Sequence, residues 1–139
     1  MRNFILLVVL DKKKTHLLAV KRAKSDTAFG GMWGLPGGEV DDGETTDLAA
    51  TRELKEETNL EIKQISLEPI LELTLTLKGT PIHLTVKSAS IQPGVPMPND
   101  KDIERVDWIM PEKLISSFMA FGVPVEAINK FQSKLKLLK

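Results

Sequence analysis

The sequence contains no cysteine and no tyrosine. Without cysteine the chain can form neither a disulfide scaffold nor a thiolate metal site, which fits a reducing cytoplasm. Without tyrosine it has no phenol to act as an acid, a base or a stacking platform. Its 19 basic and 19 acidic residues balance, so the formal net charge of zero offers no electrostatic footprint for general nucleic-acid binding. We therefore expect a cytoplasmic protein without a stable nucleic-acid partner.

Long hydrophobic runs are also missing. Phe4–Leu10 is apolar over only seven residues and is followed at once by Asp11 and three lysines. A signal peptide needs a longer apolar core, and a membrane-spanning helix needs about 20 residues. We expect no membrane association, and the 139 residues predict a single domain over 1–139.

Hydrophobic periodicity predicts an α/β fold. Phe4–Leu10 and Leu17–Lys21 indicate strands that we expect to pair as a hairpin around a charged turn. Glycines between residues 22 and 34, and prolines between 93 and 102, predict loops. Residues 35–40 are expected to be extended or turn backbone rather than helix, because they include a proline and two glycines. Further strands are expected over two or three segments of 62–91 with a turn at 78–81, and over 103–110. Helices are expected over 45–58, 111–118 and 125–138.

The segment Thr45–Thr58 carries the strongest helix signal. Thr45 or Thr46 can cap its first turn, and Asp47 suits the positive end of the helix dipole. Asn59 follows the last helical residue and can take the left-handed conformation that ends a helix. A helix with these bounds fixes which side chains share a face.

Three glutamates share one face of this helix. Glu53, Glu56 and Glu57 are spaced i, i+3, i+4, which places them within about 100° of one another around the axis. Each close pair of carboxylates repels by up to about 4 kcal/mol at a surface-like dielectric. A solvated acidic face is the simpler interpretation of the three residues alone. A hard divalent cation such as Mg²⁺ is the functional alternative, because it binds oxygen ligands and joins carboxylates to phosphates.

The surrounding residues favour the functional alternative. From Gly38 the chain reads GEVDDGETTDLAATRELKEETNL, which resembles the Nudix box G-x5-E-x7-R-E-U-x-E-E-x-G-U, where U is a bulky aliphatic residue. The residues in register are Gly38, Glu44, Arg52, Glu53, Leu54, Glu56, Glu57 and Leu60. Such a match arises by chance with a probability on the order of 10⁻⁸. Asn59 replaces the usual glycine, and asparagine is the next residue best able to adopt positive φ.

This resemblance implies a fold and an activity. The expected fold is a Nudix-type α/β/α sandwich around a mixed β-sheet, with a strand–loop–helix catalytic module. Family members use Mg²⁺ or Mn²⁺ to hydrolyse a nucleoside diphosphate linked to another group. The expected metal ligands are Glu53, Glu56, Glu57 and the Gly38 carbonyl. Arg52 is expected to orient Glu44 by a charge-assisted pair, and the general base stays open between a box glutamate and another carboxylate.

Outside the box we name four further candidates. Asp102 precedes a tryptophan by six residues, where small family members place another acidic ligand or base, and a solvated loop aspartate is an equal alternative. Arg22 ends a predicted strand and is a candidate phosphate clamp or an ordinary surface arginine. Trp33 and Phe29 are candidates for stacking on a base, or for the core. Trp108 is expected in the core.

Among Nudix activities, a MutT-like one fits best. We expect hydrolysis of a nucleoside triphosphate, oxidised or otherwise non-standard, to the monophosphate and pyrophosphate, because the short chain favours a compact substrate. Hydrolysis of ADP-ribose, a nucleotide sugar or a dinucleotide is an alternative. A regulatory Nudix module that only binds a nucleotide is another, and the intact set of glutamates disfavours it. The oligomeric state stays open between monomer and homodimer.

Overall fold

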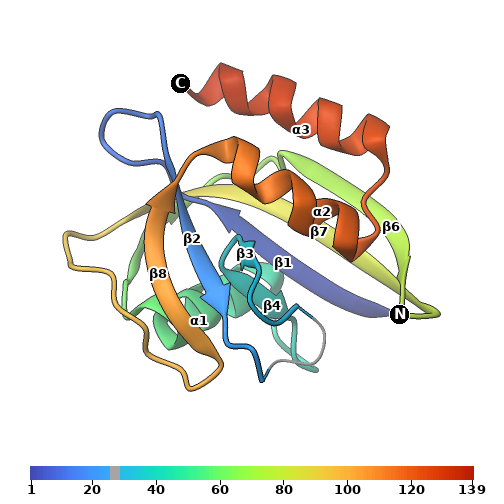
Figure 1. Cartoon of the computed structure of the whole chain (residues 1–139), viewed down its shortest axis with the longest axis horizontal. Coiled ribbons are helices and arrows are strands. Elements are labelled where there is room, and N and C mark those ends of the chain that lie inside the picture. Colours follow the sequence, from blue (N-terminus) through green and yellow to red (C-terminus); the bar gives the residue numbers. More distant parts are fainter. Residues whose placement is uncertain (26–28) are drawn as a thin grey trace.

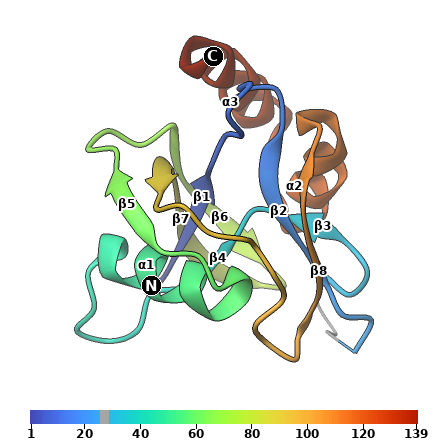
Figure 2. The same ribbon diagram turned by 90° about the vertical axis from the view of Figure 1, so that its left-hand side faces the viewer.

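Two β-sheets form the centre of the described part of the chain, residues 1–25 and 29–139 of a computed structural model (Figure 1). The first is a mixed sheet with the order β4-β1-β7-β5, and β6 also pairs with β7. Its strands are β1 (Arg2–Val8), β4 (Gly37–Glu39), β5 (Ile62–Ile65), β6 (Leu71–Leu77) and β7 (Thr80–Ile91). The second, antiparallel sheet has the order β3-β2-β8. It comprises β2 (Leu17–Arg22), β3 (Trp33–Gly34) and β8 (Ile103–Ile109), and Figure 2 sets it beside the mixed sheet.

The prediction that the first two strands pair as a hairpin is wrong. β1 pairs in parallel with β7, from Arg2 opposite Ile82 to Val8 opposite Ser88, and it pairs antiparallel with β4. Its continuation meets β2 only through the isolated bridge between Leu10 and Leu17. The chain thus leaves the mixed sheet at the end of β1 and enters the second sheet. A parallel pairing with a strand some eighty residues later leaves no local trace in the sequence.

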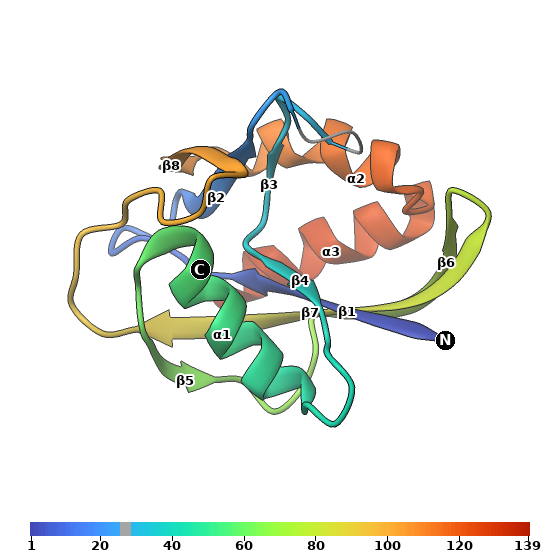
Figure 3. The same ribbon diagram turned by 90° about the horizontal axis from the view of Figure 1, so that it is seen from below.

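Helices cover both faces of the mixed sheet (Figure 3). The helix α1 (Thr46–Thr58) packs on the face that includes Ile5 and Leu7 of β1, while α3 (Val125–Leu138) packs on the opposite face. The strand period of two sends alternate side chains of β1 into these two apolar clusters. Between β8 and α3 lie a 3₁₀ turn, η1 (Pro111–Leu114), and the helix α2 (Ile115–Phe121), where the sequence predicted one short helix.

The bounds of α1 agree with the sequence prediction. The side chain of Thr45 accepts a hydrogen bond from the Leu48 N–H at 3.1 Å, so Thr45 is the N-cap. Asn59 has φ 63° and ends the helix in the left-handed region. Residues 26–28 of the predicted loop over 22–34 lie outside the described residues. Within the described ranges, no helix combines the length and apolarity needed to cross a bilayer.

Candidate active site

The short strand β4 brings the backbone close to both β1 and α1. Gly37 has φ 146°, and a Cβ at this position would overlap the Ile5 carbonyl oxygen of β1. Just before it, the Pro36 carbonyl accepts a hydrogen bond from the Leu7 N–H at 2.9 Å. Only glycine permits this approach. The contact fixes β4 against the sheet, so that its backbone also forms a wall facing the glutamates of α1.

Glu57 is the most buried of these glutamates, with 2% of its surface exposed. One carboxylate oxygen, Oε1, accepts a hydrogen bond from the Gly37 N–H at 2.9 Å. The other, Oε2, lies 2.7 Å from Nη1 of Arg22, at the end of β2. Burial raises the pKa of the Glu57 carboxyl to about 7, although Arg22 and the Gly37 N–H both act to lower it. The positive charge around Glu57 is therefore too small to offset its loss of solvation.

Glu53, one turn earlier on α1, lies against the next residue of β4. A Cβ added at Gly38 would stand 2.7 Å from Cδ and from Oε1 of Glu53, closer than real contacts permit. Burial also raises the pKa of Glu53, while the charge of Arg52 lowers it. Glycine at position 38 thus makes the room in which the Glu53 carboxylate meets the β4 backbone.

Arg52 contacts the carboxylates of Glu44, Glu53 and Glu56. Its guanidinium makes a two-pronged contact with Glu44, with Nε 2.9 Å from Oε2 and Nη2 3.0 Å from Oε1. Nη1 donates to Glu53 at 3.1 Å and lies 3.3 Å from Oε2 of Glu56, and Nη2 donates to the Glu39 carbonyl at 3.2 Å. Hydrogen bonding to Arg52 holds the pKa of Glu44 below its ordinary value. Nη2 also lies 3.4 Å from Oδ2 of the exposed Asp41, so Arg52 contacts five acidic or carbonyl groups at once, as its planar fork of donors allows.

The third glutamate of the predicted face is more open. The side chain of Glu56 is 48% exposed, against 17% for Glu53 and 3% for Glu57. The solvent exposure of the three carboxylates therefore increases from Glu57 in the protein interior, through Glu53 beside β4, to Glu56 at the surface.

The donor set suits a hard divalent cation. Carboxylate oxygens of α1 face the backbone of β4, where the Gly38 carbonyl is the expected additional ligand. In the described ranges, however, no three acidic or histidine side chains converge in a ready-made metal arrangement. The reason is visible in the contacts, because Arg22 holds Glu57 and Arg52 holds Glu53. The residues fit the ion provided that these arginine contacts rearrange.

The structure also shows where the candidate residues that lie outside the Nudix box are found. A β-bulge between Lys21 and Arg22 precedes the contact of Arg22 with Glu57, so Arg22 belongs to the acidic site. Asp102 is exposed, and its carbonyl accepts a hydrogen bond from the Ala23 N–H at 2.8 Å. Its backbone thus lies beside the end of β2, but nothing joins its carboxylate to the glutamates of α1 in the described contacts.

The two aromatic candidates have protein partners. Phe29 stacks on Phe121 of α2 with ring centroids 5.3 Å apart, and Phe121 makes an edge contact with Phe4 of β1 at 6.0 Å. Trp33 of β3 is partly buried, and the guanidinium of Arg105 lies over its ring at 5.6 Å. These rings form a patch on the α2 side of the molecule. A base would have to stack on the outside of this patch or displace one ring.

Sequence reasoning missed two groups that hold α1 in place. Gly37 donates to Glu57 through its backbone, and the double glycine at 37–38 was the available signal. Asn99 donates its side-chain amide to the Lys55 carbonyl at 3.0 Å and its N–H to the Glu57 carbonyl at 3.3 Å. Asn99 lies in a proline-rich loop where no local pattern distinguishes it from other polar residues.

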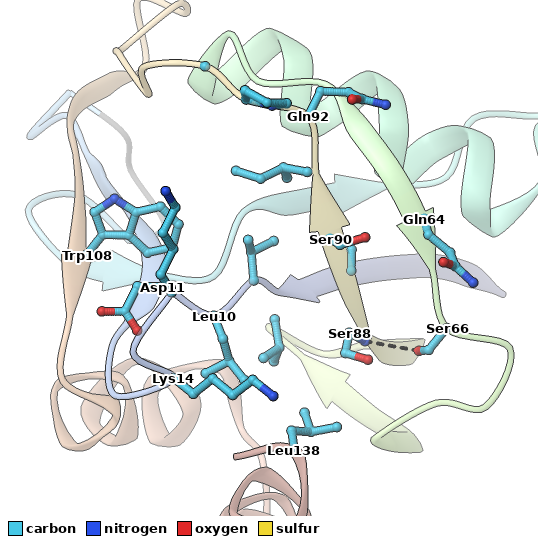
Figure 4. A pocket seen from close by; sticks show the side chains of 17 residues that line it. Leu10, Asp11, Lys14, Gln64, Ser66, Ser88, Ser90, Gln92, Trp108 and Leu138 are labelled. Carbon is cyan, nitrogen blue, oxygen red and sulfur yellow. Dashed lines mark hydrogen bonds between the residues drawn. The ribbon is translucent and has the colours of Figure 1, made fainter.

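A cavity of about 880 Å³ lies away from these glutamates, where the two sheets diverge (Figure 4). Serines 88 and 90 of β7 line it on one side and Trp108 of β8 on the other, with Leu138 of α3 at its edge. Trp108, expected in the core, is partly buried and packs on the apolar cluster beneath α1. A smaller cavity of about 490 Å³ borders Glu44 and therefore adjoins the acidic site.

Comparison with known proteins agrees with this geometry. The NUDIX domain family model matches residues 1–127. Over 60 residues the chain is 38% identical to an 8-oxo-dGTP diphosphatase of Proteus vulgaris, which is 43% of this chain and 52% of that protein, so the match spans about half of the relative's length. A MutT NUDIX hydrolase of Burkholderia pseudomallei has a similar structure, with a TM-score of 0.71 and 21% identity over 94% of this chain and 95% of the other. The NUDIX domain of Shewanella oneidensis NrtR, solved with ADP ribose, gives a TM-score of 0.70 and 17% identity over 99% and 88% of the two chains.

The chain belongs to the NUDIX domain family, because the family model covers nearly all of it. The predicted family and the predicted fold, α/β with a mixed sheet and a strand–loop–helix module, are thereby confirmed. The structural likenesses below 25% identity show the fold alone. The roles of the individual glutamates and arginines stay predictions.

Proposed function

We propose that this chain is a Nudix pyrophosphohydrolase that converts a nucleoside triphosphate, oxidised or otherwise non-standard, to the monophosphate and pyrophosphate. The observation that carries the proposal is the pair of partly or fully buried glutamates, Glu53 and Glu57, aimed at the β4 backbone beside Arg22. Burying carboxylates is unfavourable unless they are compensated. A site for cations and phosphate groups explains their position.

The ligands proposed for a divalent cation, Mg²⁺ or Mn²⁺, are Glu53, Glu56, Glu57 and the Gly38 carbonyl. When bound, such an ion neutralises phosphate charge and lowers the pKa of a bound water. It also joins protein carboxylates to the substrate, because phosphoanhydride cleavage depends mainly on positioning and on charge neutralisation. Asp102 would join the set only if its exposed loop moved toward α1.

The protein's own groups then have distinct tasks. Arg52 orients Glu44 through the two-pronged contact described above. Arg22 is placed to bind a phosphate oxygen once it leaves Glu57. Water attacks one of the two phosphorus atoms of the α–β anhydride, and the bond between that phosphorus and the bridging oxygen breaks. The monophosphate and pyrophosphate separate, and a carboxylate receives a proton of the water. A box glutamate or Asp102 is the candidate for that proton acceptor.

The proposed substrate class is supported by the relative from Proteus vulgaris, whose name is 8-oxo-dGTP diphosphatase. The partly buried aromatic patch of Phe29, Trp33 and their neighbours is the proposed base-binding region, because aromatic faces stack on bases. The proposed substrate class and the proposed base-binding region concern the nucleoside part of the substrate. They do not alter the residues proposed to bind its phosphates.

Product analysis tests the proposal. The purified protein is incubated with canonical and oxidised nucleoside triphosphates, ADP-ribose and dinucleotides, with Mg²⁺ and with EDTA, and products are separated chromatographically. We expect Mg²⁺-dependent release of pyrophosphate and a monophosphate from a triphosphate. Release of inorganic phosphate alone, or turnover in EDTA, contradicts the proposed reaction.

A second candidate activity is hydrolysis of ADP-ribose. It is favoured by the structural likeness to the NrtR domain, which was solved with ADP ribose. Turnover of ADP-ribose but of no triphosphate in the same panel would establish it. Binding of a nucleotide without turnover of any substrate would instead indicate a regulatory module.

A further inference from the structure

Arg22 occupies the inner end of the acidic site. Its Nη1 lies 2.7 Å from Oε2 of Glu57, while Oε1 of the same carboxylate accepts from the Gly37 N–H. Both carboxylate oxygens of Glu57 therefore have a donor. The side chain of Arg22 is 24% exposed, whereas that of Glu57 is 3% exposed, so the arginine has access to solvent that the glutamate lacks.

A divalent cation and Arg22 compete for this oxygen. A Mg²⁺ ion binds carboxylate oxygen at about 2.1 Å. An ion at Oε2 would bring its two positive charges to within a few ångströms of the guanidinium that already touches the same atom. Two cations so close repel strongly at a site screened from water. An ion on Oε2 of Glu57 would therefore weaken the contact with Arg22, and that contact would weaken binding of the ion.

We propose that Arg22 is a placeholder for the metal ion: it neutralises Glu57 in the metal-free protein and must leave that carboxylate before a divalent cation binds there. The inference rests on the proposed metal site and adds a competitor to it. Arg22 is a positioning residue in this role, since it acts through Glu57. Its side chain is 24% exposed, and Arg22 lies at the end of β2, at a shift of the strand register.

Release of Arg22 has a consequence for the order of binding. The arginine that leaves Glu57 becomes free to contact a phosphate oxygen, as proposed above. Binding of the metal ion would then release the guanidinium of Arg22 to bind a phosphate group of the substrate. While Nη1 of Arg22 stays on Oε2 of Glu57, a phosphate would have to compete for this guanidinium.

The experiment titrates Mn²⁺ alone into the wild type, Arg22→Gln and Lys21→Gln, by calorimetry. Lys21 is the matched control, because it precedes Arg22 in β2, carries the same charge and makes no ion pair among the described residues. If Arg22 competes with the ion, Arg22→Gln binds Mn²⁺ at least about tenfold more tightly than the wild type. Lys21→Gln changes the affinity by less than about threefold.

A second measurement separates competition from a merely structural role. Urea unfolding of the same proteins is followed in EDTA and in saturating Mn²⁺. Arg22→Gln should be less stable than the wild type in EDTA, and this deficit should close in Mn²⁺, because the metal-bound wild type no longer uses the ion pair. A deficit of equal size in both conditions, or an unchanged or weaker Mn²⁺ affinity, overturns the proposal.

If Arg22→Gln does not fold, Arg22→Lys replaces it. Lysine keeps the charge but has a shorter reach and no planar fork, so its Mn²⁺ affinity should exceed that of the wild type. Affinity equal to the wild type then overturns the proposal. The two hypotheses fail separately: a wild type that binds no Mn²⁺ removes the metal site and the placeholder with it, whereas wild-type binding without the variant effect removes the placeholder alone.

Discussion

Replacing Glu57 with glutamine removes the charge of the most buried carboxylate on α1 while nearly preserving its size. The amide oxygen can still accept the hydrogen bond from the Gly37 N–H, which is 2.9 Å long in the native protein. What disappears is an ionised group that is 2% exposed. The substitution therefore asks whether burial of this charge destabilises the metal-free protein.

The magnitude follows from the pKa of this carboxyl. Burial raises it from 4.5 to about 7, which corresponds to about 3 kcal/mol. The folded protein holds the proton at pH values where the unfolded chain has lost it, so stability falls as the pH rises from about 4.5 to 7 and is constant above. Glutamine carries no such charge. In EDTA at pH 8, Glu57→Gln should be more stable than the wild type by up to about 3 kcal/mol, with a much smaller difference at pH 5.

Urea unfolding followed by tryptophan fluorescence at pH 5 and pH 8 in EDTA measures this difference. Glu61→Gln is the matched control, because Glu61 is 68% exposed at its side chain and lies 3.7 Å from Lys55, away from β4. Its stability should change little at either pH. A Glu57→Gln protein that is less stable than the wild type at pH 8 would refute the reasoning, since the ion pair with Arg22 would then outweigh the cost of burial.

The remaining predictions concern activity and backbone geometry. Glu57→Gln should lower Mg²⁺-dependent turnover on the order of 10²-fold or more, because a charged ligand is lost, and a near-normal kcat would contradict that role. Arg52→Ala should lower kcat with little change in Mn²⁺ affinity by calorimetry, because the two-pronged contact with Glu44 orients rather than binds; an equal collapse of metal affinity would instead assign it to the metal site. Gly37→Ala should reduce the free energy of unfolding by about 3 kcal/mol or more, because its Cβ would overlap the Ile5 carbonyl at φ 146°. Gly34→Ala, where nothing lies within 4 Å of the added Cβ, is the control and should be close to neutral.

The sequence was most informative where structure is determined locally. The helix α1 begins after Thr45 and ends at Asn59 because a side-chain cap and a left-handed residue act within one turn of each end. The helix α3 has no side-chain cap at its start, and it was predicted instead from its apolar stripe, which faces the core through Ile128, Phe131 and Leu135. Local rules of this kind do not depend on the rest of the chain, so the bounds of α1 and α3 were predictable. The single helix expected over 111–118 is instead the 3₁₀ turn η1 followed by α2, which ends at Phe121.

The pairing partners of the strands could not be predicted from the sequence. The apolar strand at the N-terminus was predicted correctly as a strand, but its partner β7 lies some eighty residues away. The nearby β2, its expected partner, pairs with β8 and β3 instead. Alternation of apolar residues tells which strands are buried, but not which neighbour they choose. The contact of Arg22 with Glu57 was unpredictable for the same reason, because it joins two elements that meet only when both sheets have formed.

The charge balance of the site explains why these contacts are not simply stabilising. Two guanidinium groups contact five carboxylates, which leaves a formal charge of minus three when all five are ionised; the carboxylates belong to Asp41, Glu44, Glu53, Glu56 and Glu57. The nearest lysine of α1, Lys55, lies instead beside the exposed Glu61. A chain selected only for stability would carry an apolar residue in place of Glu57, since burying a charge is unfavourable even when the charge is paired. A divalent cation at the proposed site would offset part of this negative charge, and its binding would convert a destabilising feature of the fold into a stabilising one.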